Sequence, residues 1–390
     1  MMRLPPSVFY VLCAALLAIS ESPARAGGKP APYLPSAHIA GFTLDWPSHD
    51  RRSDGSDNWP ITWSDDDHQY TAWGDGGGFG GSNSKGRVSL GVARVEGPVD
   101  GYTGFNVWGG LKPENPAQFE GKSYGILSVA GDLYMWWGPG SGTTSYGETR
   151  LAFSNDKGGH WTLSDWDLID SDEQLIMPTI CNFGRDYAGA RDAFVYHYFI
   201  RKEPNGSGLG IHLGGDPATG KIDLARVPAD QLLEHSAYEF FSGIDGGGEP
   251  TWSADPVARV PVFEDPNGVG WNASVSYNEP LGRYLLMTEH TASFQGQLGV
   301  FDAPEPWGPW TTVSYLGDPP FGDGEIADST FFWNFANKWL STDGLDFTLV
   351  FTGVGSHDSW NTVRGSFQLG QIFGDGFESG DTSAWSNAVP

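Results

Sequence analysis

Cysteine is almost absent from this chain, whose 390 residues include only Cys13 and Cys181. Cys13 falls in an N-terminal segment with the features of a secretion signal, so Cys181 would stand alone in the mature chain and an intrachain disulfide is excluded. A chain of this length buries enough apolar surface to fold without such a cross-link. The fold must therefore rest on noncovalent packing.

Basic residues are also scarce. The 22 lysines and arginines face 48 aspartates and glutamates, which gives a formal net charge of −26. This excess of negative charge repels nucleic acids and anionic membrane surfaces. We therefore expect neither nucleic acid nor a membrane as a partner, and a strongly polyanionic substrate would require a local basic pocket.

Long hydrophobic runs are missing beyond the first residues. Arg3, the apolar run 8–19 and the small residues Ala24 and Ala26 match a secretory signal over residues 1–26. The apolar run is shorter than the roughly 18 residues that a membrane helix needs, and no later stretch approaches that length. We expect a secreted or periplasmic monomer, with one domain over 27–370 and a tail over 371–390.

The sequence lacks the spacings that mark common cofactor and nucleophile sites. No histidines or cysteines have zinc-site spacing, and there is neither a serine-nucleophile elbow nor a phosphate-binding loop. We expect no cofactor and no catalytic metal. A structural calcium ion is the one exception, since Asp375, Glu378 and Asp381 lie in the Gly-rich tail, although that tail is more simply a linker.

Glycine and aromatic residues are abundant, which suits short strands and tight turns. Glycine, at 55 residues, is about twice its usual share of roughly 7%. Beyond a first hairpin at 55–80, the expected inner strand pairs are 124–138, 182–200, 272–290 and 331–352. The expected outer strands are 87–95, 149–163, 221–227, 296–315 and 362–369. Five such units predict an all-β fold, a five-bladed β-propeller, with a β-sandwich as the competing architecture.

Three further segments bear on this architecture. Residues 154–161, SNDKGGHW, fit the pattern S-x-D-x-G-x-x-W and resemble the Asp-box turn of sialidase-type propellers, a feature of blades rather than of catalysis. Residues 38–46 are expected to supply the strand that closes the ring. Only residues 228–241, with Pro228 at the start, have a helical pattern.

The hairpin at residues 55–80 holds the main candidates for catalysis. Apolar runs flank Asp65-Asp66-Asp67, which predicts a three-residue loop that pairs Ser64 with His68. The same register places Asp57 opposite Asp75, at the open end of the hairpin. Two carboxylates side by side repel one another unless a cation, a shared proton or a substrate is present, although each Asp could instead cap its own turn.

Ligands of propellers bind where loops of several blades meet at one mouth of the central channel. We expect the residues that open the inner strands, or close their return strands, to share that mouth. The candidates for substrate binding are Tyr124, Asn182, Arg185, Asp186, His197, Trp271, Asn272, Glu289 and His290. Aromatic rings can stack on a sugar, and amide and guanidinium groups can bind its hydroxyls.

A family resemblance rests on several of these stretches. Asp57 in GSD is followed by Pro60, an aromatic-Gly-Asp motif ends at Asp75, and NFGRDYAGARDAFVYHY and WNASVSYNEPLGRYLLM occur later. Together they resemble a bacterial five-bladed propeller family long labelled as of unknown function, some of whose members are endo-D-arabinanases. The resemblance implies that Asp57 and Asp75 are the acid pair. Gly76 is a departure, since the family usually has a hydroxyl residue there.

Three functions follow as hypotheses. The first is a glycoside hydrolase that acts on a polysaccharide, with an arabinan-like furanoside as one candidate, through Asp57 and Asp75. The second is a polysaccharide lyase, with His197 or His290 and a tyrosine as base and acid and Arg185 on the uronate; His197 as a core histidine and Arg185 in an ion pair are the simpler alternatives. The third is a sugar-binding propeller without catalysis.

Overall fold

The computed structural model describes residues 29–139, 149–168, 175–201, 220–270, 272–292, 294–326, 330–353 and 358–370. The predicted signal segment, the candidate residue Trp271 and the tail with its three calcium-ligand candidates lie outside the described residues. No helix within the described ranges is long and apolar enough to cross a membrane.

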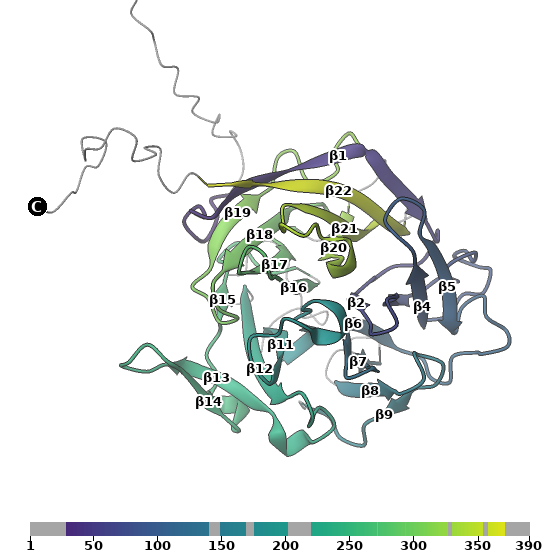
Figure 1. Cartoon of the computed structure of the whole chain (residues 1–390), viewed down its shortest axis with the longest axis horizontal. Helices are drawn as coiled ribbons and strands as arrows, with labels where there is room; N and C mark the ends of the chain where they lie inside the picture. Colours follow the sequence, from purple (N-terminus) through teal and green to yellow (C-terminus); the bar gives the residue numbers. More distant parts are fainter. Residues whose placement is uncertain are drawn as a thin grey trace, which may run out of the picture.

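Five antiparallel sheets surround one axis, as Figure 1 shows. The first sheet contains β2 (Ile61–Trp63), β3 (Gln69–Gly74), β4 (Leu90–Glu96) and β5 (Thr103–Trp108). The second contains β6 (Lys122–Val129), β7 (Asp132–Gly138), β8 (Arg150–Ser154) and β9 (Thr162–Leu163). The third contains β10 (Leu175–Ile180), β11 (Phe194–Arg201), β12 (Lys221–Pro228), β13 (Glu239–Ile244), β14 (Pro250–Ser253) and the short β15 (Phe263–Glu264).

The last two sheets complete the ring. The fourth contains β16 (Ala273–Asn278), β17 (Arg283–Glu289), β18 (Leu298–Ala303) and β19 (Thr311–Tyr315). The fifth contains β20 (Thr330–Phe335), β21 (Asp346–Gly353), β22 (Trp360–Leu369) and, from the other end of the chain, β1 (Ile39–Arg52). The fold is a five-bladed β-propeller, as predicted, and the β-sandwich alternative is wrong.

The ring closes by pairing the first strand with the last. β1 and β22 are antiparallel from Ile39↔Leu369 to Arg52↔Trp360, with shifts of register on the way. The expectation that residues 38–46 close the ring is therefore confirmed, and the closing strand is longer than expected.

The predicted Asp-box turn lies where a blade turn should be, between β8 and β9. Asp156 Oδ1 accepts hydrogen bonds from the Ser154 hydroxyl (2.9 Å) and the His160 backbone N–H (2.8 Å). The Trp161 indole, which is buried, donates to the Gly158 carbonyl at 3.0 Å. The motif thus shapes the edge of the second blade.

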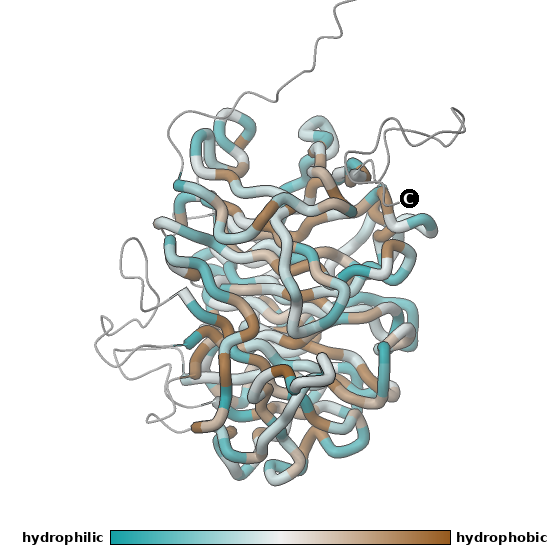
Figure 2. Tube along the Cα trace, turned by 90° about the vertical axis from the view of Figure 1, so that its left-hand side faces the viewer, coloured by the Kyte–Doolittle hydropathy of each residue, from teal (hydrophilic) through white to brown (hydrophobic). Residues whose placement is uncertain are grey.

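The inner strands fill the centre of the ring. β6, β10 and β16 are buried along nearly their whole lengths, and the tube in Figure 2 alternates between hydrophobic and hydrophilic segments as the chain crosses the core. The strands leave an axial cavity of only about 10 Å³, lined by Ile61, Ile126 and Ile180 among others. This cavity is too small to hold a sugar, so we expect ligands at a mouth of the ring.

Two details differ from the sequence prediction. Residues 228–241 form no α-helix: β12 ends at Pro228, one 3-10 turn spans His235–Ala237, and β13 begins at Glu239. In the third blade the inner strand is β10, so the expected inner pair 182–200 begins one strand too late. The error in the third blade places the residues that follow β10 at the wrong mouth.

Candidate functional site

The ring has two mouths, which the direction of the inner strands defines. Each blade is built from its inner strand outward, and the chain then passes to the inner strand of the next blade, so all five inner strands begin on the same side. We call the side where they begin the aspartate mouth, because Asp57 precedes β2 there. We call the side where they end the opposite mouth.

Asp57 lies at the aspartate mouth, where it forms an isolated antiparallel bridge with Gly74. Its backbone N–H donates to the Gly74 carbonyl at 2.8 Å, and the Gly74 N–H donates back at 2.7 Å. Although part of the residue is accessible, protein atoms surround the carboxyl group, and this burial raises its pKa to about 7. The nearby Lys122 ammonium opposes the rise, and Asp75 and Asp358 add to it.

Asp75 lies beside Asp57 in a different environment. Its backbone has φ 52°, and its carboxylate forms ion pairs with Lys122 at 2.8 Å and Arg87 at 3.1 Å. The Asp75 side chain is 36% exposed, so solvent and a substrate can reach it. Asp57 and Asp75 therefore differ: one carboxyl is enclosed, and the other is open and paired with two cations.

The register of the hairpin is one residue off the prediction at this end. Near the turn, Ile61 pairs with Thr71 and the Ser64 N–H donates to the His68 carbonyl at 2.9 Å, as expected. At the open end, the partner of Asp57 is Gly74 rather than Asp75. The prediction of a directly opposed acid pair is wrong, because the irregular backbone between Asp57 and β2 shifts the register.

The two carboxylates nevertheless lie within the reach that glycosidic chemistry requires. A β-carbon placed on Gly74 would lie 2.5 Å from Asp57 Oδ1 and 3.0 Å from the Lys122 ammonium, which in turn is 2.8 Å from Asp75. The sum of these three distances is an upper limit on the separation of the nearest oxygens of the two carboxylates. It is smaller than the roughly 9.5 Å upper limit for glycosidase acid pairs. The distances also explain the residue type at Gly74, since any side chain would collide.

Two buried asparagines, Asn58 and Asn272, form a chain of side-chain hydrogen bonds that ends at Asp57. Asn58 Nδ2 donates to Asp57 Oδ1 at 3.3 Å, and Asn58 Oδ1 accepts from Asn272 Nδ2 at 3.1 Å. Asn58 has φ 53°, a left-handed conformation that asparagine tolerates better than most residues. Asn272, predicted at this mouth because it precedes β16, thus contacts the acid pair through Asn58.

Two other predicted residues lie at the aspartate mouth. Tyr124, at the start of β6, is buried two residues after Lys122. Glu289 ends β17 and is buried, with Oε1 accepting the Phe294 N–H at 2.7 Å. Their predicted roles in binding substrate stay predictions.

Three predicted residues lie at the opposite mouth, because they follow the end of β10 rather than precede it. Arg185 donates to the Asp65 carbonyl in the turn of the first hairpin. Asp186 accepts from the Ser128 hydroxyl at 2.8 Å and from the Gly131 N–H. Asn182 bridges to Ser276 beside the axial cavity. The expectation that these residues adjoin Asp57 is wrong.

The two predicted histidines contact aromatic side chains. His197, on β11, is fully buried and accepts a hydrogen bond from the Trp136 indole at 3.0 Å, and burial lowers its pKa to about 3. His290 stacks on Tyr315 of β19, with ring centroids 3.5 Å apart and planes at 8°, and burial lowers its pKa to about 3. The simpler alternative of a core histidine holds for His197.

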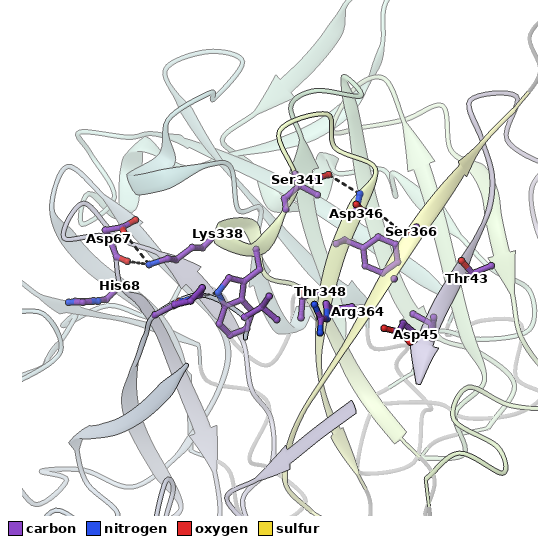
Figure 3. A pocket seen from close by; sticks show the side chains of 18 residues that line it. Thr43, Asp45, Asp67, His68, Lys338, Ser341, Asp346, Thr348, Arg364 and Ser366 are labelled. Atoms are coloured by element: carbon purple, nitrogen blue, oxygen red, sulfur yellow. Dashed lines mark hydrogen bonds and ion pairs between the residues drawn. The ribbon is translucent and has the colours of Figure 1, made fainter. Parts of the chain in front are cut away.

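A larger groove, shown in Figure 3, lies on the side of the opposite mouth between the fifth and first blades. Its volume is about 880 Å³, and β1, β21, β22 and the turn of the first hairpin line it. Its two basic residues are already paired, Lys338 with Asp67 at 3.2 Å and Arg364 with Asp100 at 2.9 Å. It holds none of the predicted site residues, so we place the candidate site at the aspartate mouth, where Asp57 and Asp75 lie.

Sequence reasoning missed Lys122, Arg87 and Asn58. Lys122 lies at the first position of β6, only two residues before the predicted start of that strand, so a small change of boundary would have found it. Arg87 is the first residue of the predicted outer strand 87–95 but precedes β4, which begins at Leu90, and it reaches Asp75 from there. Among the described residues, no group of three or more His, Cys, Asp or Glu side chains is arranged to hold a metal ion.

Several solved structures are similar in fold. A protein from Bacteroides ovatus, whose assignment as a hydrolase is provisional, has a TM-score of 0.50 and 12% identity over 81% of this chain and 87% of its own. An α-L-arabinofuranosidase from Podospora anserina, solved with cellotriose, has a TM-score of 0.48 and 12% identity over 86% and 98%. A glycoside hydrolase from Xanthomonas citri, solved with xylotriose, has a TM-score of 0.46 and 13% identity over 82% and 90%. At such identities a likeness concerns the fold alone.

Sequence comparison gives a more specific result. The curated proteins contain no match to this chain. A family model described as "Domain of unknown function (DUF4185)" matches residues 125–330, more than half of the chain, from the second blade to the start of the fifth. Asp57 and Asp75 precede the matched region, so their roles rest on the geometry of this chain. The chain belongs to the DUF4185 family.

Proposed function

We propose that this protein is a glycoside hydrolase that cleaves a polysaccharide at the aspartate mouth. The observation that carries the proposal is the contrast between the two carboxyl groups: the enclosed Asp57 has a pKa raised to about 7, and Asp75 is ion-paired and open to solvent. A protonated acid beside an ion-paired, solvent-accessible carboxylate is the division of labour used in glycoside hydrolysis. An exported enzyme with these groups would meet extracellular glycans.

The roles follow from the environments. Asp57 would donate its proton to the glycosidic oxygen as the bond to the anomeric carbon breaks, so that the leaving sugar departs as an alcohol. Asp75 would either attack the anomeric carbon or take a proton from an attacking water. The first route retains and the second inverts the configuration, and the distances allow both.

The test is incubation of residues 27–390 with a panel of neutral polysaccharides, including arabinans and xylans, followed by measurement of new reducing ends and of ultraviolet absorbance. Reducing ends without absorbance support hydrolysis, and NMR of the first product gives its anomeric configuration. We include arabinan because of the family resemblance. Binding to a glycan array without product release would favour a sugar-binding propeller instead.

The residues that the lyase hypothesis requires do not lie together. His197 is in the core, His290 stacks on Tyr315, and Arg185 lies at the opposite mouth. A lyase forms an unsaturated product that absorbs in the ultraviolet, so the panel above tests it directly. A His197→Phe variant that folds and keeps its turnover would agree with the structural role of His197.

Gly74→Ala is expected to lower kcat/KM at least about 10-fold, because misplaced catalytic groups lose much of their effect. The added methyl would overlap Asp57 Oδ1 and push the acid or Lys122 aside. Gly246→Ala is the matched control: it lies in the β13–β14 hairpin, and a β-carbon there meets no atom within 4 Å. Steady-state kinetics and melting temperatures of both variants check the prediction; equal kinetics in both would contradict it.

A further inference from the structure

The Lys122 ammonium lies close to both acids. Its ion pair is with Asp75 at 2.8 Å, and it also lies 3.0 Å from the Gly74 β-carbon position that is 2.5 Å from Asp57 Oδ1. The Lys122 side chain is only 11% exposed, so protein rather than solvent surrounds this charge. A cation enclosed by protein beside two carboxyl groups interacts with both of them more strongly than a cation in solvent would.

Hydrolysis would move the negative charge between these two carboxyl groups. When Asp57 gives its proton to the leaving oxygen, Asp57 becomes a carboxylate. In the same step Asp75 loses its charge, because its oxygen bonds to the anomeric carbon or takes a proton from water. The number of negative charges in the site is unchanged, but the charge has passed from Asp75 to Asp57.

We propose that Lys122 is a positioning residue that serves as the counter-charge of both acids in turn, pairing with Asp75 before the chemical step and stabilising Asp57 after it. This inference rests on the proposed function for its catalytic half. The electrostatic half, a lysine coupled to both carboxyl groups, depends only on the structure. A fixed charge that is already in place stabilises the new carboxylate without waiting for solvent to reorganise.

The other charged groups at the mouth do not duplicate this position. Arg87 pairs with Asp75 at 3.1 Å, but it approaches from the rim with 44% of its side chain exposed. Its effect on Asp57 is weaker than that of Lys122. Asp358 faces Asp57 from the loop before β22 and has the sign opposite to that of Lys122. Arg87 is therefore a matched control: a second cation on the same carboxylate that is more exposed and has a weaker effect on Asp57.

The first measurement needs no substrate. In protein labelled with ¹³C at aspartate carboxyl carbons, NMR titration of wild type, Lys122→Met and Arg87→Met follows Asp57, with Asp57→Asn to assign its signal. Loss of Lys122 is expected to raise the pKa of Asp57 by about one unit or more, since a cation near an acid favours its charged form. Loss of Arg87 is expected to leave the pKa of Asp57 within about half a unit. An unmoved Asp57 titration in folded Lys122→Met overturns the inference.

The second measurement uses turnover. Lys122→Met is expected to lower kcat by about 100-fold or more, in the range of a lost electrostatic contact in the transition state, and to move the alkaline limb of the pH profile upward. Arg87→Met should lower kcat less than about 10-fold with its alkaline limb in place. Lys122→Gln is a second variant should the methionine variant fail to fold, and Lys122→Arg should restore part of kcat. If Lys122 couples to both acids in the titration but no glycan is cleaved by wild type, the proposed function fails and the charge coupling stands.

Discussion

Asp75→Asn is expected to reduce kcat on the cleaved polysaccharide by about 1,000-fold or more while the propeller still folds. An amide can neither attack the anomeric carbon nor accept a proton from water, and it does not balance the cations at 2.8 and 3.1 Å. Initial rates of reducing-end release, with enzyme concentration raised to expose residual activity, measure the loss. A variant with near-normal activity would remove Asp75 from the mechanism.

A smaller side chain at the same position separates loss of chemistry from loss of structure. Asp75→Gly opens space at the mouth, and its left-handed backbone, φ 52°, is one that glycine adopts easily. Added azide should restore turnover with an activated aryl glycoside and give a glycosyl azide of inverted configuration, because on either route azide attacks from the side that the Asp75 carboxylate occupied. Asp54→Asn is the control, since Asp54 is exposed and pairs with Arg51 away from the two acids.

Asp57→Asn is expected to lower kcat on polysaccharides by about 100- to 10,000-fold, the usual contribution of a general acid. The loss should be far smaller for 4-nitrophenyl glycosides, whose leaving group departs without a proton. In wild type, kcat/KM should fall as the pH rises through about 7, where Asp57 loses its proton, and this limb should be absent from the variant. Equal losses on both substrate types would contradict the assignment of Asp57 as the acid.

The same substitution is expected to stabilise the fold at alkaline pH. The pKa of Asp57 is raised from 3.8 to about 7, so its contribution to stability is fully present below about pH 4 and is lost as the pH rises toward 7. Asparagine cannot ionise, and the variant should therefore exceed wild type in free energy of unfolding by about 1–3 kcal/mol at about pH 8, less than the whole shift implies because the residue is partly accessible. Urea unfolding of wild type and Asp57→Asn at about pH 4 and about pH 8 tests the sign of this difference in the free energy of unfolding.

Sequence alone predicts the architecture because each blade repeats the same local signals. Alternating aromatic strands, turns such as Ala130-Gly131 between β6 and β7, and the Asp-box at 154–161 all act within about 15 residues of chain. The closing strand is recognisable for the same reason, since one side of residues 39–45 is apolar. Local patterns of this kind need no knowledge of what packs beside them.

The third blade shows where such patterns fail. The inner strand β10, LIMPTI, contains a proline and lacks alternation because it is buried on both sides, so its pattern does not predict a strand. Missing it made residues after β10 look like the start of an inner strand, which moved Asn182, Arg185 and Asp186 to the wrong mouth. The helical pattern at 228–241 failed similarly, because packing of Leu232 and Tyr238 against the blade core decides the conformation there.

The candidate site was predictable in part. The family motif and the hairpin turn locate both acids at one end of β2 and β3, but the one-residue shift that pairs Asp57 with Gly74 depends on the left-handed backbone at Asn58. Lys122 comes from the next blade, and its place beside Asp75 depends on how two sheets pack. Contacts between blades are tertiary, and strand periodicity does not report them.

The pairing of β1 with β22 sets the order in which this protein can be completed. His49 and Asn361 are hydrogen-bonded although 312 residues separate them, so the fifth sheet cannot form until nearly the whole chain has been synthesised. Until then β1 and β21 lack their shared partner β22, and the ring stays open. A chain that finishes folding so late can remain unfolded during translation, the state in which a polypeptide is threaded through a narrow translocation pore.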